Sequence, residues 1–262
     1  MSDIIAVLLA AWGLCALLML ALWLIQVKTR NASYVDLGWT VGLAVCAAAY
    51  ATLLVGYPNR SLILLMLVCC WAFRLAGLLV RRLLKDPSED PRYQRIRADW
   101  KTNQNFKFFW MFQFQGLLAV ILSWPFLLIC SNPMPWFSIL EIYGIALWIV
   151  GLTGESLADW QLRRFKENPA NKGKTCDAGL WHFSRHPNYF FEWVIWIGYA
   201  VMALPALGGW TGIISPLLML FFLLKVSGIP LAEAQALKSR GEEYRRYQAS
   251  TSMFIPLPKA KI

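Results

Sequence analysis

The 262-residue chain has little charge and almost no histidine. Only 15% of its residues are charged and 58% are hydrophobic, whereas soluble domains carry about 25% charged residues. This composition excludes an ordinary soluble domain and predicts an integral membrane protein. Both histidines, His182 and His186, lie in one loop, and neither an HExxH nor a CxxC motif is present. We therefore expect no metal site.

Several other signatures are absent. The six cysteines are scattered, mostly in apolar runs, without disulfide or metal spacing, and we expect them to be small buried hydrophobes. There is no GxGxxG and no Walker loop, so any nucleotide must bind without a Rossmann or P-loop fold. The net charge is +10, but nothing resembles a nucleic-acid-binding motif. No repeat or low-complexity tract is visible, which predicts one membrane domain over residues 1–262.

Long apolar runs dominate what is present. Windows of about 20 apolar residues predict an all-α membrane protein with seven transmembrane helices. The spans are expected near residues 4–27, 35–55, 61–80, 108–130, 136–158, 188–206 and 210–226. The first run is too long for a signal-peptide core, so we expect it to remain as an anchor. A polar surface helix is expected near 229–249.

The basic residues gather on one side of this predicted topology. They follow the first, third and fifth spans and fill the C-terminal tail, whereas Arg60 alone falls on the opposite side. The positive-inside tendency then places the N-terminus outside and the C-terminus in the cytoplasm. Basic loops of this kind suit either anionic lipid headgroups or an anionic soluble ligand.

Ionisable residues inside the predicted spans are few and lie toward the basic side. Such groups are costly in a membrane and often mark function. Glu155 and Asp159 are four residues apart, so one helix face presents both carboxylates, unless they only form an intrahelical ion-pair ladder. A carboxylate near a helix start is also stabilised by the helix dipole. We expect the whole group to share one site, and its members are Asp36, Arg74, Glu155, Asp159 and Glu192.

The stretch around the second histidine predicts the start of a helix. Pro187 suits the first helical position, which makes His186 the N-cap. A helix N-terminus beside Arg185 favours phosphate or carboxylate. Asn188 and Glu192 stand one turn apart on the same face. We interpret this stretch as the mouth of a cofactor site at the membrane surface; the alternative is interfacial anchoring by the arginine and histidine.

Motifs along the chain resemble one known family. The strongest is Gly179–Leu180–Trp181 followed by Ser184–Arg185–His186–Pro187–Asn188–Tyr189 and Glu192. Further pieces agree in order: Asp36 with Trp39, Glu89–Asp90–Pro91–Arg92–Tyr93, Gln115–Gly116, Glu155 with Asp159 and Gln161, Asn171–Lys172–Gly173, Gly228–Ile229–Pro230 through Glu233, and Tyr244 with Tyr247. From about residue 30 onward the chain resembles the steroid 5-alpha-reductase family in its bacterial branch. The Arg-His-Pro element also resembles isoprenylcysteine carboxyl methyltransferases and sterol C14 and C7 reductases.

This resemblance implies an enzyme that uses NADPH to reduce the carbon–carbon double bond of a 3-oxo-4-ene steroid or another lipophilic enone. The implied location is a bacterial inner membrane, with the cofactor on the cytoplasmic side and substrate entering from the lipid. No protein partner is implied. The implied cofactor-binding residues are Arg74, Arg81, Arg82, Glu155, Asp159, Arg163, Lys166, Lys172, Arg185, His186, Asn188, Tyr189, Glu192, Glu233 and Tyr244. Trp39 and Gln115 are expected to line the substrate.

The chain departs from the family pattern at the catalytic acid. Animal members place a tyrosine in the third span, where this chain has Trp71, which can donate an N–H but cannot release a proton. The acid is then Asp36 held protonated by apolar surroundings, Tyr34, or a water. Two other functions stay open: a methyltransferase that uses S-adenosylmethionine on a lipid-linked carboxylate, and a transporter or lipid-binding protein. A transporter would more often show broken helices and a repeat.

Overall fold

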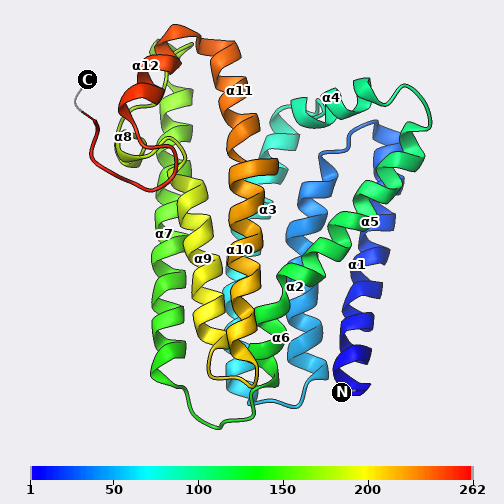
Figure 1. Cartoon of the computed structure of the whole chain (residues 1–262). Helices are drawn as coiled ribbons and strands as arrows, with labels where there is room; N and C mark the ends of the chain where they lie inside the picture. Colours follow the sequence, from blue (N-terminus) through cyan, green and yellow to red (C-terminus); the bar gives the residue numbers. More distant parts are fainter. Residues whose placement is uncertain (1, 261–262) are drawn as a thin grey trace. The chain divides into compact units, whose positions relative to one another are not determined.

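The computed structural model describes residues 2–260, and every regular element in that range is helical (Figure 1). The helices divide into two compact units. Unit 1 comprises Met1–Ser138 and Ala203–Ser215, and unit 2 comprises Ile139–Met202 and Pro216–Ile262. Each unit is described by itself.

Unit 1 is built on α2, which packs against α1, α3 and α5. Its helices are α1 (Ser2–Thr29), α2 (Tyr34–Leu53), α3 (Pro58–Lys85), α4 (Pro91–Asp99), α5 (Gln104–Leu122), α6 (Trp124–Ser131) and the 3₁₀ helix η2 (Gly209–Ile213). The predicted span 108–130 is interrupted at Ser123. Pro125 cannot donate a hydrogen bond to the preceding turn, so the chain restarts there as α6.

Unit 2 is built on α7 and α9. Its elements are α7 (Ile139–Glu167), η1 (Pro169–Asn171), α8 (Leu180–Phe183), α9 (Pro187–Ala203), α10 (Ile214–Phe221, in unit 2 from Pro216), the π-helical turn η3 (Phe222–Val226), α11 (Ile229–Arg240) and α12 (Glu242–Ser250). Glycines bring the backbones of α7 and α9 together. A Cβ at Gly144 would lie 2.7 Å from the Gly198 oxygen, and one at Gly151 2.8 Å from the Ile195 nitrogen. This close approach is typical of membrane helix pairs.

Within residues 2–260, six helical segments are long and apolar enough to cross a membrane: Ile4–Thr29, Tyr34–Leu53, Pro58–Lys85, Gln104–Ser131, Ile139–Glu167 and Gly209–Arg240. They confirm the prediction of an integral membrane protein. The remaining predicted span, 188–206, corresponds to α9. That helix has 17 residues, at the short end of the roughly 17–25 residues that a transmembrane helix needs. The count of seven spans and the orientation stay predictions.

Two details differ from the sequence predictions. The single helix expected near 229–249 is two helices, α11 and α12, because Gly241 adopts φ 56° between them. α11 also belongs to the last apolar segment, Gly209–Arg240. The expectation that the cysteines are buried is wrong for Cys70, which is exposed, and Cys69 is half-buried. The remaining four are buried.

Candidate functional site

In unit 1, the segment around α4 is hydrogen-bonded to the turn between α1 and α2. The backbone N–H of Asp90 donates to the Ser33 hydroxyl at 2.9 Å. The N–H of Ala32 donates to Glu89 at 2.8 Å, and Arg97 holds the same carboxylate at 2.7 and 2.9 Å. Asp90 also caps α4 by accepting from the backbone N–H at position 92. These bonds fix α4 beside the first turn of α2.

The result is a polar group that we call the Asp36 cluster: Asp36, Arg82, Asp90, Arg92 and Tyr93. The Arg92 guanidinium donates to Oδ2 of Asp36 at 2.7 Å, and the Tyr93 hydroxyl donates to Oδ1 at 2.6 Å. Arg92 and Arg82 both pair with Asp90. The side chains of Asp36 and Arg92 are 24% and 32% exposed. The cluster is therefore partly open, and both oxygens of Asp36 act as acceptors.

Two members of this cluster have shifted pKa values. Burial raises the pKa of Asp90, but the hydrogen bonds and charge of Arg92, helped by Arg82, outweigh it and lower the pKa from 3.8 to about 2. Burial first, and then the negative charge of Asp36, raise the pKa of Tyr93 well above its ordinary value. At neutral pH the cluster thus holds an ionised Asp90 and a protonated Tyr93.

Other predicted residues of unit 1 lie on α2, α3 and α5. Trp39, one turn after Asp36 on α2, contacts the buried Trp71 of α3 edge to face, with ring centroids 5.7 Å apart. Arg74 is half-buried on α3, and Arg81 and Arg82 are exposed. Tyr34 and Gln115 are half-buried and make no side-chain hydrogen bond to any residue that the structure describes.

An apolar hollow of about 490 Å³ lies elsewhere in unit 1. Trp12 of α1, Ile121 of α5 and Trp124 of α6 contribute to its walls. Trp12 lies toward the N-terminal end of α1, and Asp36 follows the C-terminal end of that helix. The helix runs for 17 residues from Trp12 to its last residue, Thr29. At a rise of about 1.5 Å per residue, the hollow and the Asp36 cluster are at opposite ends of unit 1.

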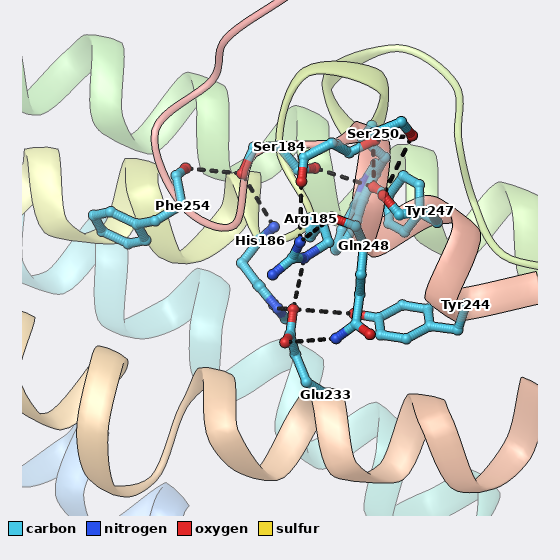
Figure 2. A network of polar contacts seen from close by, with 11 residues as sticks. Ser184, Arg185, His186, Glu233, Tyr244, Tyr247, Gln248, Ser250 and Phe254 are labelled. Atoms are coloured by element: carbon cyan, nitrogen blue, oxygen red, sulfur yellow. Dashed lines mark hydrogen bonds and ion pairs between the residues drawn. The ribbon is translucent and has the colours of Figure 1, made fainter. Parts of the chain in front are cut away.

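In unit 2, one carboxylate collects four donors. Glu233 of α11 accepts from Arg185 at 2.7 Å, His186 at 3.3 Å, Tyr244 at 3.4 Å and Gln248 at 2.9 Å (Figure 2). We call these five residues the Glu233 cluster. The side chains of Arg185, His186 and Glu233 are only 11%, 6% and 16% exposed. The cluster is enclosed, and it ties α11 and α12 to the start of α9.

The C-terminal segment closes over the same residues. Arg185 also donates to the backbone carbonyls of Gln248 and Thr251 at 2.8 and 3.0 Å. The Ser184 hydroxyl donates to the Phe254 carbonyl at 2.8 Å (Figure 2). Burial, and then the charge of Glu233, raise the pKa of Tyr244 to about 12. In this structure Arg185, predicted to face phosphates, is engaged inside the protein.

The predicted start of α9 is confirmed. Pro187 is its first residue, and the His186 carbonyl accepts the first helical hydrogen bond, from Phe190 at 3.1 Å. The Gly179 motif has a steric reason. Gly179 has φ 62°, and a Cβ there would lie 2.4 Å from the side chain of Gln161. Gln161 accepts from the N–H of Leu180 at 2.9 Å, which joins the motif to α7.

The first turn of α9 meets the polar face of α7. The Asn188 amide donates to Asp159 at 3.2 Å, and its oxygen is buried without a hydrogen-bond partner among the residues described. Glu155 and Glu192 are 6% and 8% exposed, and Glu192 accepts from the indole of Trp196 at 2.7 Å. Tyr189 stacks on the imidazole of the preceding N-cap. Three predicted basic residues around the end of α7 are exposed: Arg163, Lys166 and Lys172.

The structure thus brings the predicted residues together in two places. Asp159 joins Asn188, and Glu233 joins Arg185, His186 and Tyr244, all within unit 2. Asp36 belongs to unit 1, so the expectation that it shares a site with Glu155 and Glu192 stays a prediction. Sequence reasoning gave no role to Arg92 or Tyr93. The Asp–Pro pair before them signals a helix start, but nothing in the sequence indicates that they contact Asp36, 56 and 57 residues away.

Comparisons with known proteins agree with a membrane-protein family and name no activity for most of the chain. The chain is 25% identical to the uncharacterized protein C594.04c of Schizosaccharomyces pombe over 90% of its length and 75% of that relative. It is 44% identical to the probable O-methyltransferase ustE of Ustilaginoidea virens over 46 residues, which are 18% of this chain and 16% of that protein. No solved structure matches. Residues 22–251 match the family described as protein of unknown function (DUF1295), and with its six apolar helical segments the chain is a membrane protein of the DUF1295 family.

Proposed function

We propose that the protein is a membrane-embedded, NADPH-dependent reductase that saturates the carbon–carbon double bond of a lipophilic enone. A 3-oxo-4-ene steroid is the substrate that the family resemblance favours. The observation that carries the proposal is the Asp36–Tyr93 pair, a carboxylate and a phenol joined by a 2.6 Å hydrogen bond in a partly open cluster. The cofactor side is proposed to face the cytoplasm, where basic loops gather.

The chemistry needs a proton donor at the carbonyl oxygen of the enone. When bound, NADPH supplies the hydride that adds to the β-carbon, and negative charge then develops on that oxygen. A hydrogen-bond donor placed there stabilises the charge. Tyr93 is proposed as this donor, because burial and the charge of Asp36 keep its hydroxyl protonated. Its single O–H, which donates to Asp36 in this structure, would turn to the carbonyl oxygen when the enone binds, and Asp36 would keep Arg92 as its partner. We propose that Tyr93 takes the role of carbonyl donor, because Trp71 can donate only through its indole N–H.

Asp36 is proposed to hold Tyr93 in place rather than to release a proton itself. Both of its oxygens already accept hydrogen bonds, one from Tyr93 and one from Arg92. This arrangement orients the phenol and keeps it protonated. The role differs from the sequence-based hypothesis of a protonated Asp36.

Residues of unit 2 are proposed to bind the dinucleotide. The buried oxygen of Asn188, unpartnered within residues 2–260, can accept from a carboxamide or a ribose hydroxyl. Asp159 beside it can accept from a second hydroxyl. The exposed basic residues suited to the phosphates are Arg163, Lys166 and Lys172. Arg185, Glu233 and Tyr244 are then proposed to shape the site through the Glu233 cluster.

Binding of the cofactor can be tested without knowing the substrate. NADPH fluorescence is titrated with the purified protein and with Asn188→Ala, and Asn59→Ala serves as the matched control because Asn59 is exposed on α3 in unit 1. We expect NADPH to bind saturably to the wild type and to the control. The affinity of Asn188→Ala for NADPH should be lower by a factor of about ten or more, because one or two hydrogen bonds are lost. Equal affinity in all three proteins would remove Asn188 from the site.

A second candidate is a methyltransferase that uses S-adenosylmethionine. The observation in its favour is the short match to a probable O-methyltransferase. Such a cofactor carries no phosphates, so it does not account for the exposed basic residues that follow Asp159 at the end of α7. The nucleotide that co-purifies with the protein distinguishes the two: NADP(H) supports the reductase, and S-adenosylhomocysteine supports the methyltransferase.

A further inference from the structure

Unit 1 carries a second cavity, this one polar and open to the surface, that neither the proposed reaction nor the Asp36 cluster uses. It has a volume of about 490 Å³ and is lined by Arg30, Lys101, Asn103, Gln104, Asn105 and Phe106. A water molecule takes up about 30 Å³, so the cavity has room for a group as large as a lipid headgroup. Five of its six lining side chains are polar, and two carry positive charge.

The two cations of this cavity are not neutralised. The side chains of Arg30 and Lys101 are exposed and form no ion pair with any residue in the described part of the chain. The Arg97 guanidinium donates to the backbone carbonyl of Arg30 at 3.4 Å, but its charge is matched by Glu89. No carboxylate lines the cavity. Its surface is therefore complementary to an anion, and the amides of Asn103 and Gln104 can add donors.

The cavity lies where lipid headgroups are expected. It is bounded by the end of one apolar segment, Ile4–Thr29, and by the beginning of another, Gln104–Ser131. Aromatic side chains, which are common at membrane interfaces, lie near the same ends of α1 and α5. Phe106 and Trp110 are 63% and 59% exposed, and the indole of Trp23 donates to the Asn105 carbonyl at 2.9 Å.

We propose that this cavity binds the phosphate of an anionic membrane phospholipid, with the acyl chains lying along the apolar surfaces of α1 and α5. The position at the ends of two apolar segments favours a lipid over a free phosphate. A soluble phosphate would gain only the contacts of its charge, whereas a lipid adds the burial of its chains against exposed residues such as Leu24 and Phe106. The site is independent of the proposed reductase activity.

The test compares a variant that lacks the two positive charges of the cavity with a control variant that lacks two positive charges outside it. The variant is Arg30→Gln with Lys101→Gln, and the control is Lys28→Gln with Arg95→Gln, which loses the same charge from exposed positions that do not line the cavity. Native mass spectrometry of the full chain in detergent measures the affinity for added phosphatidylglycerol, with phosphatidylcholine as the neutral lipid. Circular dichroism checks that all three proteins keep the same helicity.

We expect the cavity variant to bind phosphatidylglycerol about 30-fold more weakly than the wild type, because each basic residue near an anionic headgroup contributes about fivefold. The control is expected to stay within a few-fold of the wild type, and phosphatidylcholine to bind equally to all three. An equal loss in the control would overturn the site in favour of a general basic surface. Glycerol phosphate that binds as tightly as the lipid would overturn the assignment to a phospholipid.

Discussion

The Asp36 cluster of unit 1 and the Glu233 cluster of unit 2 both join a carboxylate to arginine and tyrosine, but they differ in the number of donors and in exposure to solvent. Glu233 is one acceptor surrounded by four donors, and the side chains of its arginine and histidine partners are 11% and 6% exposed. Asp36 has two donors, and it and Arg92 are 24% and 32% exposed. An enclosed, fully paired carboxylate is suited to holding helices in place. The partly open Asp36 cluster is the one to which we assign the proposed reaction.

The largest effect should come from breaking the enclosed cluster. Arg185→Ala removes three hydrogen bonds and leaves Glu233 buried without its closest cation. We expect the free energy of unfolding to fall by about 3–5 kcal/mol, measured by denaturation in detergent. Arg245→Ala, which breaks an exposed ion pair with Glu242, should cost no more than about 1 kcal/mol. Equal losses would mean that the Glu233 cluster does not hold unit 2 together.

The open cluster should respond in turnover rather than in stability. Tyr93→Phe removes the hydroxyl that donates to Asp36, and loss of a general acid typically slows catalysis by about 10²-fold or more. We expect the rate of enone reduction to fall by that factor, while the affinity for NADPH changes little. Tyr143→Phe is the control, because Tyr143 is exposed on α7. An unchanged rate in the Tyr93 variant would remove it from the proposed mechanism.

The pKa of Asp90 gives the open cluster a pH dependence. Its folded pKa of about 2 is below the ordinary value of 3.8, so its stabilising effect is fully present above about pH 4 and is lost as the pH falls toward 2. A shift of this size corresponds to about 2 kcal/mol. We expect the wild type to lose stability over this window more steeply than Asp90→Asn, as followed by thermal unfolding in detergent. Parallel curves would contradict the assigned pairing with Arg92 and Arg82.

The smallest effect concerns the backbone that leads into the enclosed cluster. Gly179→Ala and Gly173→Ala both place a side chain at positive φ, 62° and 80°, but only the first meets a neighbour, Gln161 at 2.4 Å. We expect Gly179→Ala to be less stable than Gly173→Ala by about 1 kcal/mol, the excess coming from the steric contact. Thermal unfolding of the two variants side by side measures the difference. A larger loss of stability in Gly173→Ala would show that backbone strain, and not the contact with Gln161, determines the cost of the substitution.

The sequence was sufficient where a signal is local. Apolar runs predicted seven spans, six of which correspond to the membrane-length segments, and the proline at 187 predicted the start of α9 and its N-cap. The i, i+4 pair of carboxylates on α7 indicated a polar face, and Asp159 does meet Asn188. The break between α5 and α6 also had a local signal, Pro125, but averaging hydropathy over a long window conceals a single proline.

The sequence was insufficient where partners are distant. Arg92 and Tyr93 reach Asp36 only because Glu89 and Asp90 bond to the turn at 32–33, and no pattern in the chain encodes that docking. The four donors of Glu233 come from positions up to 48 residues away. The sequence predicts Arg185 as a phosphate ligand beside a helix N-terminus, but it does not show that Arg185 pairs with Glu233 of α11.

The proposed activity is tested most directly by following a labelled hydride. The full-length protein in lipid bilayers is incubated with NADPH deuterated at the transferable position and with a 3-oxo-4-ene steroid, and the product is analysed by mass spectrometry. We expect a saturated ketone that carries one deuterium at the former β-carbon, formed at a much lower rate by Tyr93→Phe. Recovery of unreduced enone from the wild type, across steroid and shorter lipophilic enones alike, would contradict the proposed reductase.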